Sequence, residues 1–207
     1  MRGIAFLKKL LFAVAFGAAF AAASVARADE IEVAEARLAA TEDGVVLSAD
    51  FAFELNPRLV EVVTNGVPLY FVVEFELTRP RWYWFDEKAA TRRIQMRLSY
   101  NALSRQYRLS NGGLQQSYPT LEEALNVLRR LRNAHVVDRG TSLADANYEA
   151  AVRMRLDVTL LPRPFQLSAI TSREFNLESP WRRFTFRPPS AGPAPVESRE
   201  PKEADAK

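Results

Sequence analysis

Apolar and polar residues alternate along much of the chain, which is the pattern of a β-strand with one buried face. The alternation is clearest from Val67 to Thr78 and from Thr91 to Tyr100, where large apolar side chains occupy every second position. Each such side chain stabilises a fold by about 1.5 to 3 kcal/mol when it is buried. We therefore expect these two stretches to pair as a hairpin at the centre of the core.

The polar positions of this hairpin carry opposite charges. We expect the chain to reverse near Phe85-Asp86. This reversal places the acids of one strand beside bases of the other: Glu74 and Glu76 near Arg97 and Arg93. Exposed ion pairs contribute at most about 1 kcal/mol, so we expect these pairs to mark the register of the strands on an exposed face.

Other alternating stretches predict four more strands, which span Ile31–Ala40, Val45–Leu55, Arg105–Ser110 and Ala151–Leu161. Within the first of them the apolar positions slip by one residue, which predicts a β-bulge near Ala34. Glu42-Asp43-Gly44 predicts the turn that follows, because glycine tolerates positive φ.

Two segments have apolar residues three and four positions apart, which predicts amphipathic helices. In NPRLVEVVTNG, Asn56 is placed to cap the helix and Pro57 to occupy its first turn. The second helix begins after Thr120, has Glu123 in the capping-box position and extends over Leu121–Arg132.

The remaining segments are less regular. We expect a loop at residues 136–147. We expect a last strand pair, or an extended cover over the core, at Phe165–Phe186. Long antiparallel strands with two short helices predict an α+β, mainly β fold built on one curved antiparallel sheet. A β-sandwich with helical insertions is the alternative.

The start of the chain is typical of an export signal. Lys8 and Lys9 precede the apolar run Leu10–Ala23, and Ala26-Arg27-Ala28 fits the small-x-small rule for cleavage. We expect residues 1–28 to be a cleaved signal peptide and the protein to be periplasmic. An uncleaved membrane anchor is the alternative, although the run is shorter than a typical membrane-spanning helix.

Composition defines the domain between the signal and the C-terminus. Residues 188–207 contain five prolines and few apolar side chains, which predicts a disordered tail. Residues 29–187 are then a single β-rich domain. The chain has no cysteine, so burial alone must stabilise this domain, and thiol catalysis and cysteine metal sites are excluded.

Removal of the signal also changes the charge argument. The whole chain has a formal net charge of +3, but residues 1–28 hold four bases and no acid. The rest of the chain is therefore close to neutral. Nothing in this balance predicts a basic face for nucleic acid.

Motifs with catalytic or metal-binding spacing are missing from the sequence. There is no glycine-rich phosphate loop, no Gly-x-Ser-x-Gly motif and no His-Glu-x-x-His pair. His135 is the only histidine and has no partner predicted to position it for acid-base catalysis. We therefore expect no catalytic residue, cofactor or metal. Scattered carboxylates that meet only in the folded chain are the remaining route to an enzyme.

Four consecutive aromatic residues, Trp82, Tyr83, Trp84 and Phe85, lie at the expected end of the central hairpin. In a strand, alternate rings point to opposite faces, so both faces carry aromatic side chains. They either pack under another element or form an exposed contact surface. This aromatic tip is the candidate interaction surface.

Several long stretches resemble one proteobacterial family, domain of unknown function 4390. They are NPRLVEVVTNGVPLYFVVEFEL, RPRWYWFDEK, LSYNALSRQYRLS, LEEAL and LPRPFQLSAITSREFNLESPWRRFTF. Phe175 stands where members of that family commonly have tryptophan. The resemblance implies an exported protein with no established activity or catalytic residue. It also suggests a membrane sensor kinase as a signalling partner, because the genes of that family often lie beside the gene of such a kinase.

The leading hypothesis is therefore a non-enzymatic periplasmic accessory or interaction protein with an envelope protein, such as a membrane sensor kinase, as its partner. The alternative is a carrier of an apolar ligand such as a lipid, enclosed between the curved sheet and the helix Leu121–Arg132. An enzyme that uses scattered carboxylates is the third hypothesis.

Overall fold

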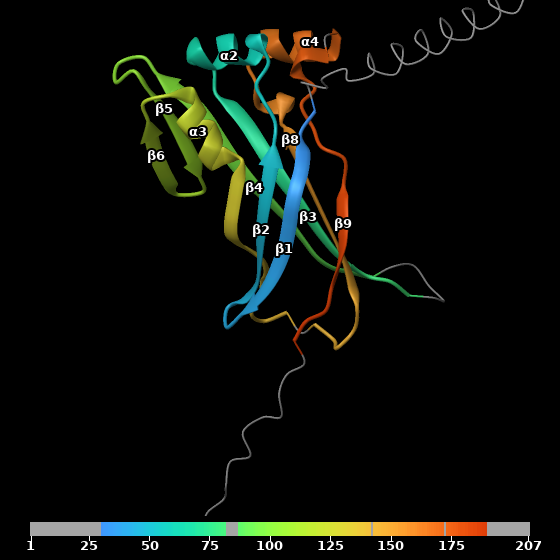
Figure 1. Cartoon of the computed structure of the whole chain (residues 1–207). Coiled ribbons are helices and arrows are strands. Elements are labelled where there is room, and N and C mark those ends of the chain that lie inside the picture. The colour runs from blue at the N-terminus through green and yellow to red at the C-terminus, as the bar shows by residue number, and fades with distance from the viewer. Residues whose placement is uncertain (1–29, 82–86, 142, 172, 190–207) are drawn as a thin grey trace, which may run out of the picture.

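Two antiparallel sheets form the protein in this computed structural model, which describes residues 30–81, 87–141, 143–171 and 173–189 (Figure 1). The smaller sheet has the order β1-β2-β7, with β1 at Glu32–Thr41, β2 at Gly44–Ala52 and β7 at Arg130–Asp138. The larger sheet has the order β6-β5-β4-β3-β8-β9. Its strands in chain order are β3 (Leu69–Arg79), β4 (Glu87–Asn101), β5 (Gln106–Asn111), β6 (Leu114–Tyr118), β8 (Tyr148–Leu156) and β9 (Arg182–Phe186).

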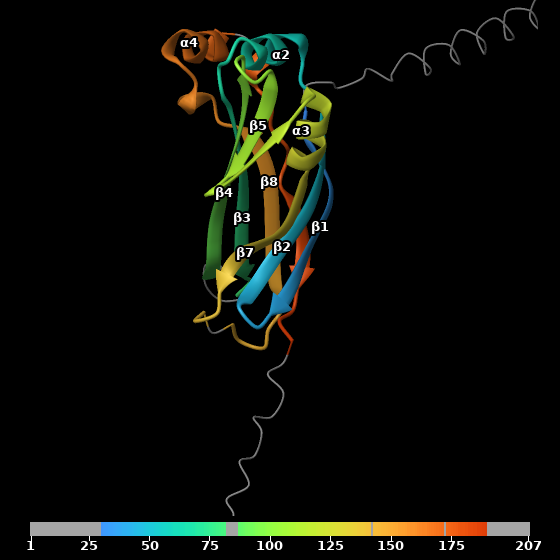
Figure 2. The same ribbon diagram turned by 90° about the vertical axis from the view of Figure 1, so that its left-hand side faces the viewer.

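Short helices complete the domain. They are α2 (Pro57–Thr64), α3 (Leu121–Leu128) and α4 (Arg163–Thr171), with single 3-10 turns η1 (Val158–Leu160) and η2 (Arg173–Phe175). Helices α2 and α4 lie together at one end of the two sheets (Figures 1 and 2). The predicted fold class is confirmed: the protein is mainly β, its sheets are antiparallel, and the arrangement is the two-sheet alternative.

The central hairpin is confirmed as β3 and β4. Strand β3 lies between β4 and β8, and its alternate residues Phe71, Val73, Phe75 and Leu77 are fully buried. These side chains belong to one continuous apolar cluster with residues of the smaller sheet and of α2 and α3. The face of β3 that carries Phe71 is therefore the inner face of the larger sheet, and the opposite face is called its outer face below.

Local signals in the sequence correctly place several turns and caps. The register between β1 and β2 shifts between Val33 and Glu35, which is the predicted bulge. Gly44 has φ +126°, and a Cβ atom there would lie 2.1 Å from the carbonyl oxygen of Val137, so the turn requires glycine. The Asn56 side chain accepts a hydrogen bond from the N–H of Leu59, as expected of a helix cap.

The second helix is shorter than predicted. It ends at Leu128, and Arg130–Asp138 forms strand β7, which pairs with β2. The predicted loop at residues 136–147 is therefore wrong for Val136 and Val137, which are buried strand residues. The apolar spacing of Leu125, Leu128 and Leu131 fits both a helix and a helix followed by a strand, and pairing with a distant strand decides between them.

Three further elements differ from the predictions. Strand β6 was not predicted, because residues 114–117 are exposed on both faces and leave no alternation. Helix α4 replaces part of the expected extended segment Phe165–Phe186, whereas β9 confirms a strand near its end. Strand β8 stops at Leu156, where the Asp157 side chain caps η1, so Leu160 is exposed rather than inward-facing.

Some predictions fall on residues outside the described part of the chain. These are the signal peptide, the aromatic tip Trp82–Phe85 and most of the C-terminal tail, and each of them stays a prediction. Among the helices formed by residues 30–189 as described above, none has the length and apolar character needed to cross a membrane.

Candidate functional site

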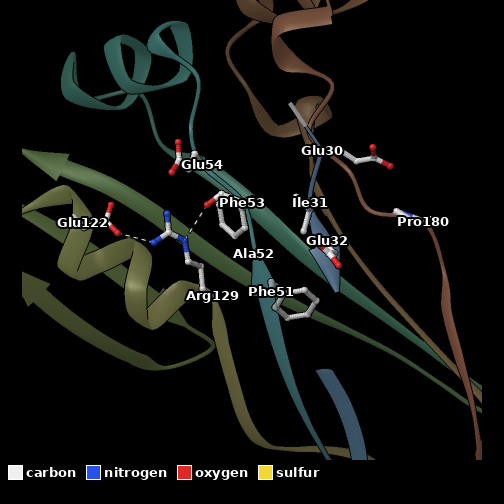
Figure 3. Close-up of a pocket in the computed structure, with 10 residues that line it drawn as sticks. All are labelled: Glu30, Ile31, Glu32, Phe51, Ala52, Phe53, Glu54, Glu122, Arg129 and Pro180. Carbon is white, nitrogen blue, oxygen red and sulfur yellow. Dashed lines mark hydrogen bonds and ion pairs between the residues drawn. The ribbon is translucent and has the colours of Figure 1, made fainter. Parts of the chain in front are cut away.

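An open groove of about 820 Å³ lies beside the start of β1, the end of β2 and helix α3 (Figure 3). Segments far apart in the sequence form it, because the two strands, the helix and the segment before β9 meet at this place. The lining residues are Glu30, Ile31, Glu32, Phe51, Ala52, Phe53, Glu54, Glu122, Arg129 and Pro180.

The floor of the groove is apolar and fixed by the core. Phe51 and Phe53 are buried, and the ring centre of Phe53 lies 5.6 Å from that of Phe71 on β3. Ile31 is also fully buried, and its N–H donates a hydrogen bond of 3.2 Å to the carbonyl oxygen of Glu178. These contacts anchor the floor to both sheets, so the groove is preformed.

Arg129 joins helix α3 to strand β2 at the side of the groove. Its Nε donates to the carbonyl oxygen of Phe53 at 3.0 Å, and its Nη1 lies 2.6 Å from Glu122 Oε1 (Figure 3). Its guanidinium carbon lies 5.6 Å from the centre of the Phe53 ring, and its carbonyl oxygen accepts from the N–H of Phe51 at 2.8 Å. With 19% of its side chain exposed, Arg129 is a structural link between the two elements.

The rim of the groove has more carboxylates than cations. Glu54 and Glu122 lie near Arg129, while Glu30 and Glu32 lie on the side of Pro180 (Figure 3). All four carboxylate residues are exposed, and among the described residues only Glu122 has a cationic partner. The groove therefore combines an apolar floor with a negative rim, which favours a ligand that presents cations beside apolar groups.

A second cluster of charges surrounds Glu74 on the outer face of the larger sheet. The sequence places Glu74 in an exposed pair with Arg97, and this expectation is wrong. Glu74 is 5% exposed, and the strand register sets it opposite Arg93 on β4 and Arg153 on β8. The neighbouring Glu76 does form an exposed pair, but with Lys88 at 3.4 Å.

Three arginines share the Glu74 carboxylate. Arg153 donates from Nε at 2.7 Å and from Nη2 at 2.6 Å, and Arg155 Nη2 and Arg93 Nη2 lie at 3.3 and 3.2 Å. The indole ring of Trp181 covers Arg153, with the guanidinium carbon 4.7 Å from its centre. This cluster connects β4, β3 and β8 across the outer face.

The environment of Glu74 acts on its pKa in two opposite directions. Burial alone raises the pKa of this carboxyl group, but the hydrogen bond and the charge of Arg153, together with those of Arg155, outweigh burial. The pKa of Glu74 is consequently lowered from its ordinary value, and the group is ionised at neutral pH. Glu74 is therefore a structural carboxylate with satisfied hydrogen bonds rather than a proton donor.

The aromatic tip is described only up to its flanks. Strands β3 and β4 remain paired as far as Arg79 and Glu87, and Arg81 forms an ion pair with Glu87. Trp82, Tyr83, Trp84 and Phe85 lie beyond these pairs, outside the described residues. Their role as an interaction surface stays a prediction.

His135 is exposed on β7, and its carbonyl oxygen accepts from Arg92 Nε at 3.3 Å. Within the described ranges, no group of three His, Cys, Asp or Glu residues is arranged to hold a metal ion.

Sequence reasoning missed the groove. It predicted only a helix over Leu121–Arg132 that includes Arg129, whereas the Arg129 guanidinium group donates a hydrogen bond to the carbonyl oxygen of Phe53, just after β2. The seven-residue spacing of Glu122 and Arg129, about two helical turns, was a usable signal that they lie on one side of the helix. No comparable signal connects either residue to Glu30 or Glu54.

Among comparisons with known proteins, a family model matches this chain. No curated protein and no solved structure matches the chain. The model of one family, domain of unknown function (DUF4390), matches residues 28–185 and so includes the groove, the Glu74 cluster and both sheets. Because the match extends over most of the chain, the protein belongs to the DUF4390 family.

Proposed function

We propose that this protein is a non-enzymatic binding protein of the bacterial envelope whose groove recognises a basic segment of a partner protein. The observation that carries the proposal is the excess of carboxylates around a fixed apolar floor. Glu30, Glu32 and Glu54 have no cationic partner among the residues that the structure describes, so a partner's Lys or Arg can supply one.

The two parts of the groove suit the two parts of a basic side chain. The methylene stem of a lysine or arginine packs on apolar surface while its charged end reaches the rim. Buried Phe51 and Phe53 provide such a surface, and the exposed carboxylates surround it. Exposed charges of this kind act mainly on association rate and selectivity, and salt screens them beyond about 8 Å at physiological ionic strength.

The cellular setting is part of the same proposal. The apolar run after Lys8 and Lys9 supports export, and a chain without cysteine needs no oxidising machinery to fold. The family resemblance suggests a membrane sensor kinase as a candidate partner in the envelope.

A carrier of an apolar ligand has less support. The core between the sheets is a continuous cluster of buried side chains, and the groove that opens beside it has an acidic rim. A fatty acid or an anionic lipid would bring its own negative charge to this rim, which is unfavourable.

A peptide-binding experiment tests the proposal. The probe is an octapeptide of alternating lysine and leucine, and the matched control peptide has glutamate in place of lysine. Fluorescence anisotropy with the exported form of the protein should show binding of the lysine peptide only, weakening as salt is added. Equal affinity for both peptides would contradict the proposal.

Variants assign the binding to the groove. Replacing two rim residues, Glu32→Gln with Glu54→Gln, should weaken binding about tenfold, which is about 1.4 kcal/mol. The matched control, Glu35→Gln with Glu42→Gln, removes the same charge from exposed positions outside the groove lining and should leave affinity unchanged. If both double variants bind alike, the groove is not the site.

A further inference from the structure

A second pocket, of about 430 Å³, opens on the outer face of the larger sheet. Strands β3, β4 and β5 and the turn after β5 form it, and its lining includes none of the residues of the acidic groove. The lining residues are Tyr70, Arg93, Ile94, Gln95, Arg97, Ser110, Asn111 and Gly112. None of them is acidic, so the pocket has the opposite charge from the groove.

Arg97 is a positive charge without an acidic partner. Its guanidinium carbon lies 5.9 Å from the centre of the Tyr70 ring, and it forms no ion pair with any described residue. Strand pairing sets Arg97 directly opposite Tyr70 on β3 and Ser110 on β5. Contact with an aromatic ring orients the guanidinium group but leaves its hydrogen-bond donors and its charge available.

Arg93 stands at the other side of the pocket and is only partly neutralised. Its single described ion pair is with Glu74, whose carboxylate also receives the closer hydrogen bonds of Arg153. Arg93 has 71% of its side chain exposed, against 29% for Arg153. Asp157 also pairs with Arg155, but Arg153 and Arg93 still share the single Glu74 carboxylate, so Arg93 retains capacity for an external anion.

Arg108 adds positive charge beside the pocket. It lies on β5 opposite Ser99 of β4, two residues from Ser110, which places it diagonally next to Arg97 on the same face. Its Nε is buried and has no hydrogen-bond acceptor. Buried donors are normally satisfied in folded proteins, so this nitrogen is a second sign that the surface lacks an acceptor.

The acids on this face are already engaged elsewhere. Glu76 pairs with Lys88, Glu149 with Arg183, and Asp157, which follows β8 beside Tyr70, with Arg155; none of these acids lines the pocket. Gln95 and Ser110, which the register places on the outer face, add amide and hydroxyl groups to the lining. Arginines combined with neutral donors are the arrangement that binds oxyanions, because the guanidinium group matches phosphate and carboxylate geometry.

We propose that this pocket binds a small soluble anion that carries phosphate or carboxylate groups, held between Arg93 and Arg97. Four residues of a strand extend about 13 Å, so an anion with two charged groups can reach both arginines. This site is independent of the proposed peptide groove.

Titration calorimetry at low ionic strength tests the proposal with three probes: inorganic phosphate, pyrophosphate and citrate. At least one should bind, and Arg97→Gln should weaken that binding about tenfold or more, equivalent to about 1.4 kcal/mol. Arg183→Gln is the matched control, because it removes an exposed arginine from the same face at a position paired with Glu149. It should retain the wild-type affinity, and circular dichroism should show that both variants are folded.

The probes also distinguish the sources of the anion. Binding of phosphate or pyrophosphate without citrate assigns a phosphorylated ligand, and the reverse assigns a polycarboxylate. Three results would overturn the proposal: no binding of any probe up to about 10 mM, equal weakening by Arg97→Gln and Arg183→Gln, or binding only to phosphatidylglycerol vesicles. The last would indicate a membrane surface rather than a small ligand.

Discussion

Two regions of the molecule differ in their balance of charge: bases outnumber acids around Glu74, and acids outnumber bases in the groove. Around Glu74, three arginines surround one buried carboxylate and connect three strands. In the groove, Arg129 is the one cation in the lining and is already bonded to Glu122 and to Phe53, while the other rim carboxylates remain exposed. The difference teaches that burial separates structural charges from binding charges, because only a buried charge must find its partner within the chain.

Removal of the Glu74 charge should have the largest effect. Among the described residues, Glu74→Gln leaves Arg153 without its counter-charge and leaves Arg155 with only its pair to Asp157 at 3.7 Å, and we expect a loss of about 2 to 3 kcal/mol in the free energy of unfolding. The two arginines keep 29% and 24% of their side chains exposed, which limits the loss. Urea unfolding measures it. Glu76→Gln breaks only an exposed pair and should cost about 0.5 kcal/mol or less. Equal losses in the two variants would show that the Glu74 cluster is not structural.

Loss of the link between helix α3 and strand β2 should have a smaller effect. Arg129→Ala removes the hydrogen bond to the Phe53 carbonyl and the contact with its ring, and we expect a loss of about 1 to 2 kcal/mol. Relative to wild type, amide hydrogen exchange in this variant should become faster in α3 but stay unchanged in β4. The neighbouring Arg130 is exposed, so Arg130→Ala should change neither quantity. Unchanged exchange in α3 would contradict the role of Arg129.

The smallest effect should appear as a pH dependence. Because the pKa of Glu74 is lowered in the folded state, its stabilising contribution is fully present above its ordinary value of 4.5. The contribution is lost as pH falls through the lowered pKa. The stability difference between wild type and Glu74→Gln should therefore be constant near neutral pH and shrink as the pH falls below 4.5. A difference that stays constant into acid would mean that Glu74 is not stabilised as a carboxylate.

The sequence was sufficient for the parts of the fold that depend on local pattern. Alternation identified the β3–β4 hairpin, and capping residues identified the starts of α2 and α3. It failed for β7, because Leu131 suits a helix stripe as well as a strand, and only pairing with β2 decides the outcome. It also failed for β6, whose exposed residues have no buried face to reveal the strand.

The charge clusters could not be predicted from local sequence pattern for a related reason. Predicting the partner of Glu74 needs the register of β3 against β4, which shifts between Leu77 and Thr78, and needs β8 as the other neighbour. The groove joins residues near positions 31, 53, 122 and 180, and only the complete fold brings them together. Recognition of outward-facing charges thus requires tertiary structure, whereas recognition of the core does not.

The position of the groove decides how the protein should be handled. Glu30 lines the rim, so any tag, dye or linker joined just ahead of it is attached beside the carboxylates (Figure 3). Strand β9 instead leads the chain away to the opposite end of the sandwich from α2 and α4 (Figure 1). Immobilisation on a sensor chip through the residues that follow β9 therefore keeps the groove accessible, and attachment directly before Glu30 obstructs it.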